Sequence, residues 1–208
     1  MAKAGWDVTV LEKHDMPGGR ARRFSEAGFT FDMGPSWYWM PDVFERYFGY
    51  FDKKGSDYYS LPRLDPSYTV YYPEENISVP SDYGALKKLF ESVERGSAAM
   101  LDKFLEEAAY KYHTGMNKLV YKPGLSFTEF IDADLAKGIL RLDVFTDMKK
   151  HIGKYFKHPY LQQVLEFPVL LLGALPQKIP ALYSLMNYPD MKMGTCSPQN
   201  GLYNIIKG

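Results

Sequence analysis

The chain has 208 residues, of which 46% are hydrophobic and 24% are charged, and this balance is ordinary for a soluble globular protein. Its 25 basic and 25 acidic residues cancel, so no net field attracts nucleic acid, and we predict no nucleic-acid partner. The only cysteine, Cys196, excludes an internal disulfide, and the longest apolar stretch is far shorter than the roughly 20 residues that cross a bilayer.

The first part of the chain alternates short apolar runs with a glycine-rich loop. Residues 1–4 have the pattern of a last helical turn, which Gly5 ends. Residues 8–11 form a β-branched run that is typical of a buried strand. The glycine-rich loop over residues 15–20 comes next, and a pair of strands is predicted over residues 21–24 and 29–31.

Apolar residues recur mainly at helical spacing from residue 42 onward. Asp42 is a predicted N-cap, and Ser126 with Glu129 has the spacing of a capping box. Helices are predicted over residues 42–51, 83–94, 97–118, 126–132, 135–142, 147–156, 159–172 and 180–188, and strands over residues 68–72 and 77–79. The change from mixed to mainly helical pattern places a domain boundary near Leu61, between domains of residues 1–61 and 62–208.

An acidic residue, Glu12, ends the first predicted strand. A Rossmann unit places such a carboxylate at the end of a buried strand, where it accepts hydrogen bonds from the ribose hydroxyls of a dinucleotide. The complete motif has a glycine-rich turn about 20 residues upstream, and that position falls before Met1. Because acidic residues after strands are common on protein surfaces, a solvated carboxylate is the alternative.

A second element follows at short range, after Pro17. Gly18 and Gly19 allow the backbone to approach a phosphate closely, with their N–H groups available to it. Arg20 adds a permanent positive charge in a planar fork that suits phosphate oxygens. The alternative is a plain β-turn with a solvated arginine.

Together these residues resemble a known family. The strings VTVLEK (residues 8–13), PGGR (17–20) and FTFDMGPS (29–36) resemble the bacterial-type phytoene desaturases, which are carotenoid desaturases within the amine-oxidase-like FAD flavoproteins. The strand-acid and Gly-Gly-Arg elements are shared by the wider class. The strings LEFPV (165–169) and LYSLMNY (182–188) are more specific to the carotenoid branch, so the similarity runs through nearly the whole chain.

The resemblance implies an α/β fold with FAD as cofactor. It implies a Rossmann-like FAD-binding domain, which lacks its first strand and glycine-rich turn, followed by a mainly helical substrate domain. It implies that Glu12 binds the adenosine ribose, that Gly18, Gly19 and Arg20 line the diphosphate, and that Gly34, Pro35 and Ser36 approach the flavin through their backbone. Because a strand and a phosphate-facing helix N-terminus are absent, we expect the chain by itself to bind FAD weakly or not at all and to be inactive.

The implied activity is desaturation of a carotenoid hydrocarbon, of the phytoene-to-lycopene type. A flavin accepts a hydride while a proton leaves the neighbouring carbon, so the protein mainly aligns the substrate and excludes water, and we nominate no catalytic side chain. Related functions are a carotenoid ketolase, an isomerase-like relative, a retinoid saturase or a non-catalytic truncated relative. A wall of the substrate tunnel is predicted at Trp37, Tyr38, Trp39 and Met40, with ordinary core packing as an equal alternative.

Two further expectations concern metals and membranes. His151 and His158 share a face if their helix continues, but Pro159 follows and no carboxylate completes a set, so we predict no metal site. A substrate dissolved in lipid favours a cytoplasmic protein attached peripherally to a membrane surface. The oligomeric state stays open.

Overall fold

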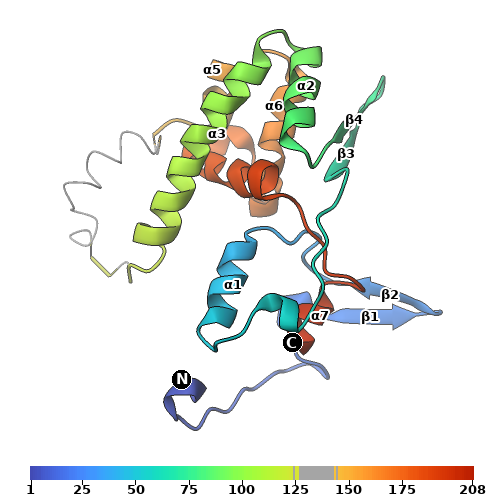
Figure 1. Ribbon diagram of the computed structural model, residues 1–208, viewed down its shortest axis with the longest axis vertical. Helices are drawn as coiled ribbons and strands as arrows, with labels where there is room; N and C mark the ends of the chain where they lie inside the picture. Colours follow the sequence, from blue (N-terminus) through green and yellow to red (C-terminus); the bar gives the residue numbers. More distant parts are fainter. Residues whose placement is uncertain (124, 127–142, 144) are drawn as a thin grey trace. The chain divides into compact units, whose positions relative to one another are not determined.

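The computed structural model describes residues 1–123, 125, 126, 143 and 145–208 (Figure 1). The chain divides into two compact units, Met1–Ser67 with Met193–Gly208 (unit 1) and Tyr68–Lys192 (unit 2). The assignment of an FAD-binding and a substrate-binding domain to parts of the chain stays a prediction. Apart from Ser126, the predicted helices over residues 126–132 and 135–142 lie outside the described residues.

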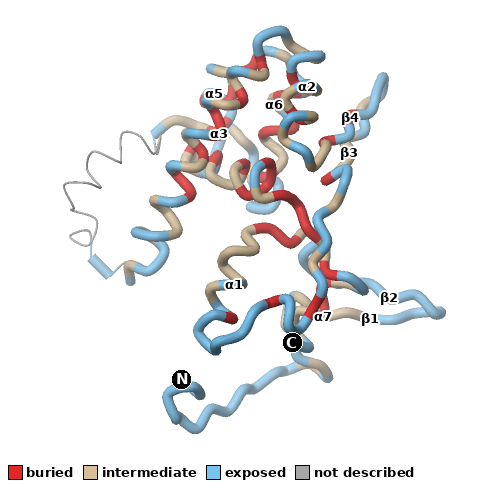
Figure 2. The backbone as a smooth tube through the Cα atoms, in the orientation of Figure 1, coloured by how far each residue is buried: buried red, intermediate tan, exposed pale blue. Residues whose placement is uncertain are grey.

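Unit 1 begins with a short helical turn, Ala2–Ala4, which ends at Gly5 with a left-handed φ of 83°, as predicted. The predicted strand over residues 8–11 is wrong: these residues are neither strand nor helix in the structure. Val10 and Leu11 are 86% and 91% exposed, and Figure 2 shows the whole segment as exposed. A strand needs a neighbour for its N–H and C=O groups, and none of the described residues pairs with this segment.

The next two strands form a hairpin. Strands β1 (Arg23–Glu26) and β2 (Phe29–Asp32) pair antiparallel, which confirms the predicted strand pair with a later start for the first strand. Ala27 and Gly28 connect them with φ values of 49° and 84°. Positive φ at both central residues matches the twist of a two-residue hairpin turn. The rings of Phe24 and Phe31 stack at 4.9 Å, and both remain partly exposed.

A small aromatic core holds unit 1 together. Helix α1 (Pro41–Gly49) has Met40 as its N-cap, so the predicted N-cap Asp42 is wrong. The helix begins earlier because a proline is well suited to the first helical position. The side chains of this core are Tyr38, Phe48, Tyr59, Cys196 and Leu202. The last helix, α7 (Tyr203–Lys207), starts where the Asp32 carboxylate accepts hydrogen bonds from the N–H groups of Leu202 at 2.8 Å and Tyr203 at 3.3 Å.

Unit 2 consists of one hairpin and a group of helices. Its elements are β3 (Tyr68–Tyr71), β4 (Asn76–Val79), α2 (Tyr83–Val93), α3 (Ser97–Thr114), α5 (Met148–Tyr155) and α6 (Pro159–Glu166). Short 3-10 and π turns follow at Phe167–Leu172, Ala181–Met186 and Pro189–Met193. Aspartate side chains cap two helices: Asp82 accepts from the N–H of Ala85 at 2.7 Å, and Asp147 from that of Lys150 at 2.8 Å. The sequence predicts β3, β4, α2, α3 and α5 to within a few residues, whereas the helix predicted over residues 159–172 ends at Glu166 and continues as a 3-10 turn over Phe167–Leu172. The turn at Pro189–Met193 was not predicted.

The helices of unit 2 enclose its hydrophobic core, which Figure 2 shows as buried stretches on their inner faces. The ring of Phe156 meets Phe90 and Phe104 edge to face, at 5.6 Å and 6.0 Å between centroids. The mixed α/β class is therefore confirmed, with helices in the majority. Both sheets in the described part of the chain are two-stranded and antiparallel, so the predicted Rossmann sheet is not seen there. Among the same residues, no helix is long and apolar enough to cross a membrane.

Truncation of Phe90 tests this core. The side chain is fully buried, so Phe90→Ala removes apolar contacts and leaves a cavity. We expect the free energy of unfolding, measured by urea denaturation, to fall by about 3–5 kcal/mol. Phe145→Ala is the matched control, because Phe145 is 88% exposed, and its effect should stay within about 0.5 kcal/mol. Equal losses for the two variants would contradict the described core.

Candidate functional site

Glu12 lies beside the glycine-rich loop of unit 1. Its Oε1 atom accepts a hydrogen bond from the backbone N–H of His14 at 3.1 Å. This hydrogen bond is the main reason why the pKa of Glu12 lies below its ordinary value, and the backbone N–H of Gly19 acts in the same direction. The carboxylate is therefore ionised at neutral pH, exposed, and close to the loop with which the sequence analysis associates it.

The loop has a backbone that glycine alone adopts easily. Gly18 and Gly19 have φ values of 118° and 53°, in the left-handed region that penalises a side chain. The N–H of Ala21 then donates to the carbonyl of Gly18 at 2.8 Å and closes a 3-10 turn over Gly19–Ala21. Two adjacent residues thus present backbone without side chains next to Glu12.

Gly34 packs directly against this loop. A Cβ atom at position 34 would lie 1.9 Å from the backbone oxygen of Arg20, a distance that no side chain tolerates. One residue earlier, the N–H of Met33 donates to the carbonyl of Arg22 at 2.9 Å. The structure therefore brings together two strings that the sequence analysis treats separately, PGGR and FTFDMGPS.

Basic side chains surround the same loop. The side chain of Arg20 is exposed, whereas Arg22 is half-buried and its Nη1 donates to Nε2 of His14 at 2.6 Å. Since Nε2 accepts this bond, the proton of the neutral His14 ring lies on Nδ1. Neither Arg22 nor His14 was predicted as a site residue. The available signal was their position in the sequence, because His14 lies two residues after Glu12 and Arg22 lies two residues after Arg20.

The residues that follow Gly34 divide into exposed and buried positions. Pro35 and Ser36 are exposed, and Trp37 is half-buried with its ring stacked on Trp39 at 6.0 Å. Tyr38 and Trp39 lie in the core of unit 1, where the two hydroxyls of Tyr38 and Tyr59 are 2.7 Å apart.

The polar atoms of this segment have partners inside unit 1. The indole N–H of Trp39 donates to Oγ1 of Thr195 at 2.9 Å. Burial, together with the hydrogen bond to Tyr59, raises the pKa of Tyr38 far above its ordinary value, so its phenol stays neutral. The substrate role predicted for residues 37–40 stays a prediction.

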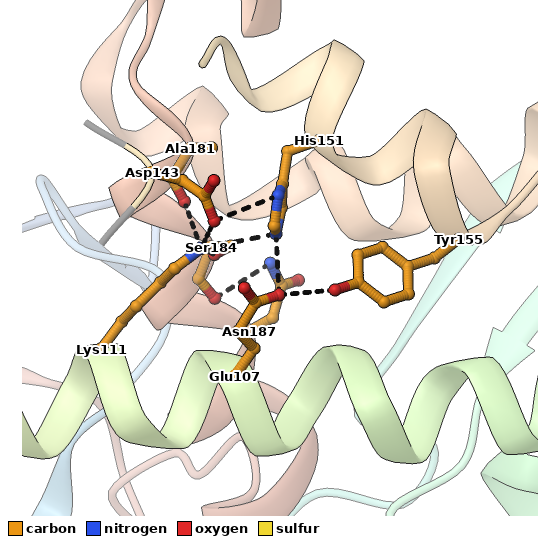
Figure 3. Close-up of polar contacts among 8 residues, drawn as sticks. All are labelled: Glu107, Lys111, Asp143, His151, Tyr155, Ala181, Ser184 and Asn187. Atoms are coloured by element: carbon orange, nitrogen blue, oxygen red, sulfur yellow. Dashed lines mark hydrogen bonds and ion pairs between the residues drawn. The ribbon is translucent and has the colours of Figure 1, made fainter. Parts of the chain in front are cut away.

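Unit 2 contains a separate group of buried and half-buried polar side chains around Lys111, which we call the Lys111 cluster (Figure 3). Its members are Glu107, Lys111, Asp143, His151, Tyr155, Ser184 and Asn187. The Nζ atom of Lys111 donates to Oδ2 of Asp143 at 3.0 Å, to Oγ of Ser184 at 3.2 Å and to the carbonyl of Ala181 at 3.4 Å. The side chain of Lys111 is fully buried, so this ammonium depends on protein groups for its solvation.

His151 lies between two carboxylates in this cluster. Its Nε2 is 3.6 Å from Oε2 of Glu107, and its Nδ1 is 3.5 Å from Oδ2 of Asp143. Burial, and then the charge of Lys111, lower the pKa of His151 to about 4, so the ring is neutral at pH 7. Tyr155 donates to Oε2 of Glu107 at 2.6 Å. Two acidic groups thus approach opposite edges of one neutral imidazole.

His151 and His158 lie on different helices and do not form the pair that the sequence suggested. His158 lies at the start of α6 instead, where its Nδ1 accepts from the N–H of Tyr160 at 3.3 Å. The carboxylates near His151 come from Glu107 on α3, which is far away in sequence, and from Asp143, which precedes His151 by eight residues. One signal was available: Lys111 falls on the apolar face of α3, in register with Phe104 and Ala108.

The chain is similar to one protein family and to several curated proteins over most or all of its length. The sequence pattern of the family described as "Flavin containing amine oxidoreductase" matches residues 1–178. A "Carotenoid 3,4-desaturase" of Haloarcula japonica is 40% identical over 210 residues, which cover 100% of this chain and 42% of the relative. A "zeta-carotene-forming phytoene desaturase" of Myxococcus xanthus is 31% identical over 206 residues, with 99% of this chain and 40% of the relative covered.

A third relative is similar to this chain over the same length. The "4,4'-diapophytoene desaturase (4,4'-diaponeurosporene-forming)" of Staphylococcus aureus is 31% identical over 210 residues, which cover 100% of this chain and 42% of the relative. The chain thus spans about two fifths of the length of these curated relatives.

Substitution of Gly34 tests the contact between the two strings of unit 1. Gly34→Ala places a methyl group on the carbonyl of Arg20, so the backbone must move. We expect a loss of about 1–3 kcal/mol in the free energy of unfolding, measured by chemical denaturation. Gly49→Ala is the control, because a Cβ at this helical position meets nothing within 4 Å. An unchanged Gly34→Ala variant would show that the two strings do not touch.

Proposed function

The chain belongs to the family of flavin-containing amine oxidoreductases, and from this we propose that it forms the cofactor-facing part of an FAD-dependent carotenoid desaturase. The observation that carries the proposal is the contact of Gly34 with the backbone of Arg20, next to Glu12 and Gly19. The three relatives, which are described as desaturases of carotenoids or their precursors, support the same activity.

The residues around this contact fit the chemistry of FAD. The ionised Glu12 accepts hydrogen bonds from ribose hydroxyls, as the acidic residue of a Rossmann unit does. Gly18 and Gly19 offer backbone N–H groups without side chains to the diphosphate, and the exposed Arg20 balances its charge. Gly34, Pro35 and Ser36 continue toward the flavin ring. In this proposal, residues 1–61 are a partial FAD-binding domain of Rossmann type, and residues 62–208 contribute to substrate binding.

In this proposal the chain helps to align the hydrocarbon substrate with the flavin and does not supply acid–base groups for the reaction. When bound, the flavin supplies the hydride acceptor. A hydrocarbon has no polar group to recognise, so binding relies on apolar burial, at about 25 cal/mol per Å² removed from water. Trp37 and Met40, both half-buried, are the proposed substrate contacts among residues 37–40, with Tyr38 and Trp39 supporting them from the core of unit 1.

The test uses the protein expressed from the whole reading frame that contains this chain. Under anaerobic conditions, with phytoene in liposomes, we expect the flavin absorption to bleach while a conjugated product appears. A bound flavin that ignores phytoene would favour another carotenoid or retinoid oxidoreductase of the family. A folded protein without flavin would overturn the proposal.

Glu12→Gln tests the cofactor contact in the same protein. Loss of a charge-assisted hydrogen bond should weaken FAD binding about tenfold, measured by equilibrium dialysis. Glu26→Gln, an exposed glutamate on β1, is the matched control and should leave the affinity unchanged. Equal affinities for the two variants would exclude Glu12 from the ribose site.

We also propose that the protein attaches to the cytoplasmic face of a membrane, where its substrate dissolves. Support comes from a run of leucines after α6: Leu170, Leu171, Leu172 and Leu175 are 66%, 52%, 47% and 60% exposed. No charged residue interrupts the sequence between Glu166 and Lys178. Such an apolar segment can enter the interfacial layer of a bilayer without crossing it.

Replacement of two of these leucines tests the attachment. Leu171→Ser with Leu172→Ser removes apolar area that would be buried in lipid, so we expect co-sedimentation with phosphatidylcholine vesicles to weaken at least tenfold. The control is Val120→Ser with Tyr121→Ser, since these side chains are 59% and 60% exposed. Equal binding by both double variants would argue against this surface.

A further inference from the structure

The Lys111 cluster brings two carboxylates, Glu107 and Asp143, close to one buried imidazole. Lys111 sets one ammonium against them inside the cluster, and the charge of Lys154 acts on Asp143 and His151 from outside it. The side chains of Lys111 and His151 are 0% and 2% exposed, so water does little to screen these charges. Two neighbouring carboxylates with little access to water attract a cation.

Unpaired polar atoms mark the same place. In the described part of the chain, three buried side-chain polar atoms lack a hydrogen-bond partner: Ser97 Oγ, His151 Nδ1 and Asn187 Oδ1. Two of the three belong to the Lys111 cluster, and Figure 3 shows His151 pointing between the carboxylates of Glu107 and Asp143. An unsatisfied buried polar atom calls for a bound water or ion. Because Nε2 accepts from Lys111 Nζ at 3.4 Å, the lone pair of the neutral ring lies on Nε2, and the proton lies on Nδ1, which faces Asp143 at 3.5 Å. Nε2 is therefore the metal-binding nitrogen of this ring, at the position that the ammonium now occupies.

The donor atoms have the spacing of a metal site. Glu107, Asp143 and His151 each offer one ligand atom, and these atoms lie within 4.8 Å of one another. One nitrogen and two carboxylate oxygens, each about 2.0–2.2 Å from the ion, suit Zn²⁺. Tetrahedral ligands at these distances lie roughly 3.4 Å from one another, so the widest of the three spacings, at most 4.8 Å, has to close by up to about 1.4 Å when the ion binds.

We propose that Glu107, Asp143 and His151 bind one divalent metal ion, with Zn²⁺ as the best match, and that the ammonium of Lys111 is the competing cation. The ammonium now lies 3.0 Å from Asp143 and 3.4 Å from His151 Nε2. When a metal enters, Lys111 keeps its bonds to Ser184 and to the carbonyl of Ala181. A divalent ion would bind both carboxylates directly, whereas the ammonium of Lys111 donates to Asp143 alone of the two. The proposal departs from the expectation, based on the sequence alone, that the protein has no metal site.

The site is reached from the surface of α3. Glu107 is 30% exposed and lines a pocket of about 230 Å³ together with Lys103, Glu106 and Tyr110. An entry path, three ligands and neighbouring groups that hold them are the features expected of a metal site. Tyr155 is such a neighbouring group, because its hydroxyl donates a hydrogen bond to Oε2 of Glu107 at 2.6 Å. The metal ties α3 to α5 and takes no part in the flavin chemistry, so the inference stands apart from the proposed function.

The test measures Zn²⁺ binding to the chain after removal of metals with a chelator. Equilibrium dialysis with elemental analysis should give one Zn²⁺ per chain. Glu107→Gln and His151→Gln should each weaken the affinity at least tenfold. Glu106→Gln and His113→Gln are the matched controls, as exposed residues of the same types on α3, and should bind like the unchanged protein. Circular dichroism before and after loading shows that each variant is folded.

A second variant separates a metal site from a purely structural cluster. Lys111→Met removes the competing ammonium, so the affinity for Zn²⁺ should rise at least tenfold, whereas a structural cluster gains no metal affinity. The dialysis of the unchanged protein decides the matter even if this variant does not fold. No uptake by the unchanged protein, or uptake that Glu107→Gln and His151→Gln leave intact, would overturn the proposal.

Discussion

The carbonyl of Arg20 occupies the space that a side chain at position 34 would need, and the arrangement of unit 1 depends on this contact. It fixes the glycine-rich loop against the residues that follow β2, so the backbone on both sides can lie next to one ligand. The Asp32 carboxylate, two residues earlier, holds the start of α7 through two backbone N–H groups. A short stretch of chain therefore joins the loop, the hairpin and the last helix.

Much of this could be predicted from the sequence, because the relevant information is local. The φ values of Gly18 and Gly19 exclude most other residues, so a Gly-Gly pair reports its own backbone conformation. The helices of unit 2 follow the same logic: Asp82 and Asp147 act as N-caps, and apolar residues recur with the helical period. The contact of Gly34 with Arg20 could not be predicted from the sequence, because neither string contains local information about which carbonyl group Gly34 contacts in the fold.

Two failures have physical causes of a different kind. The β-branched residues 8–11 have the composition of a strand, but strand formation depends on a pairing partner and not on propensity alone. The Lys111 cluster was missed because its members are distant in sequence, and because charged residues are expected at the surface. Lys111 is fully buried among Phe104, Ala108 and other apolar residues of α3. Only tertiary contacts reveal that this lysine is solvated by protein.

The two sites also respond to different physical demands. Around Arg20 backbone packs against backbone, so no side chain fits at position 34, and the side chain of Arg20 is left exposed. Around Lys111 the side chains recognise one another, and burial strengthens every charge interaction among them. Burial also keeps the His151 ring neutral at pH 7, which leaves a lone pair for Lys111 or for a metal ion. Removal of Lys111 therefore exposes an unmet charge in unit 2, whereas removal of the Gly34 contact displaces backbone in unit 1.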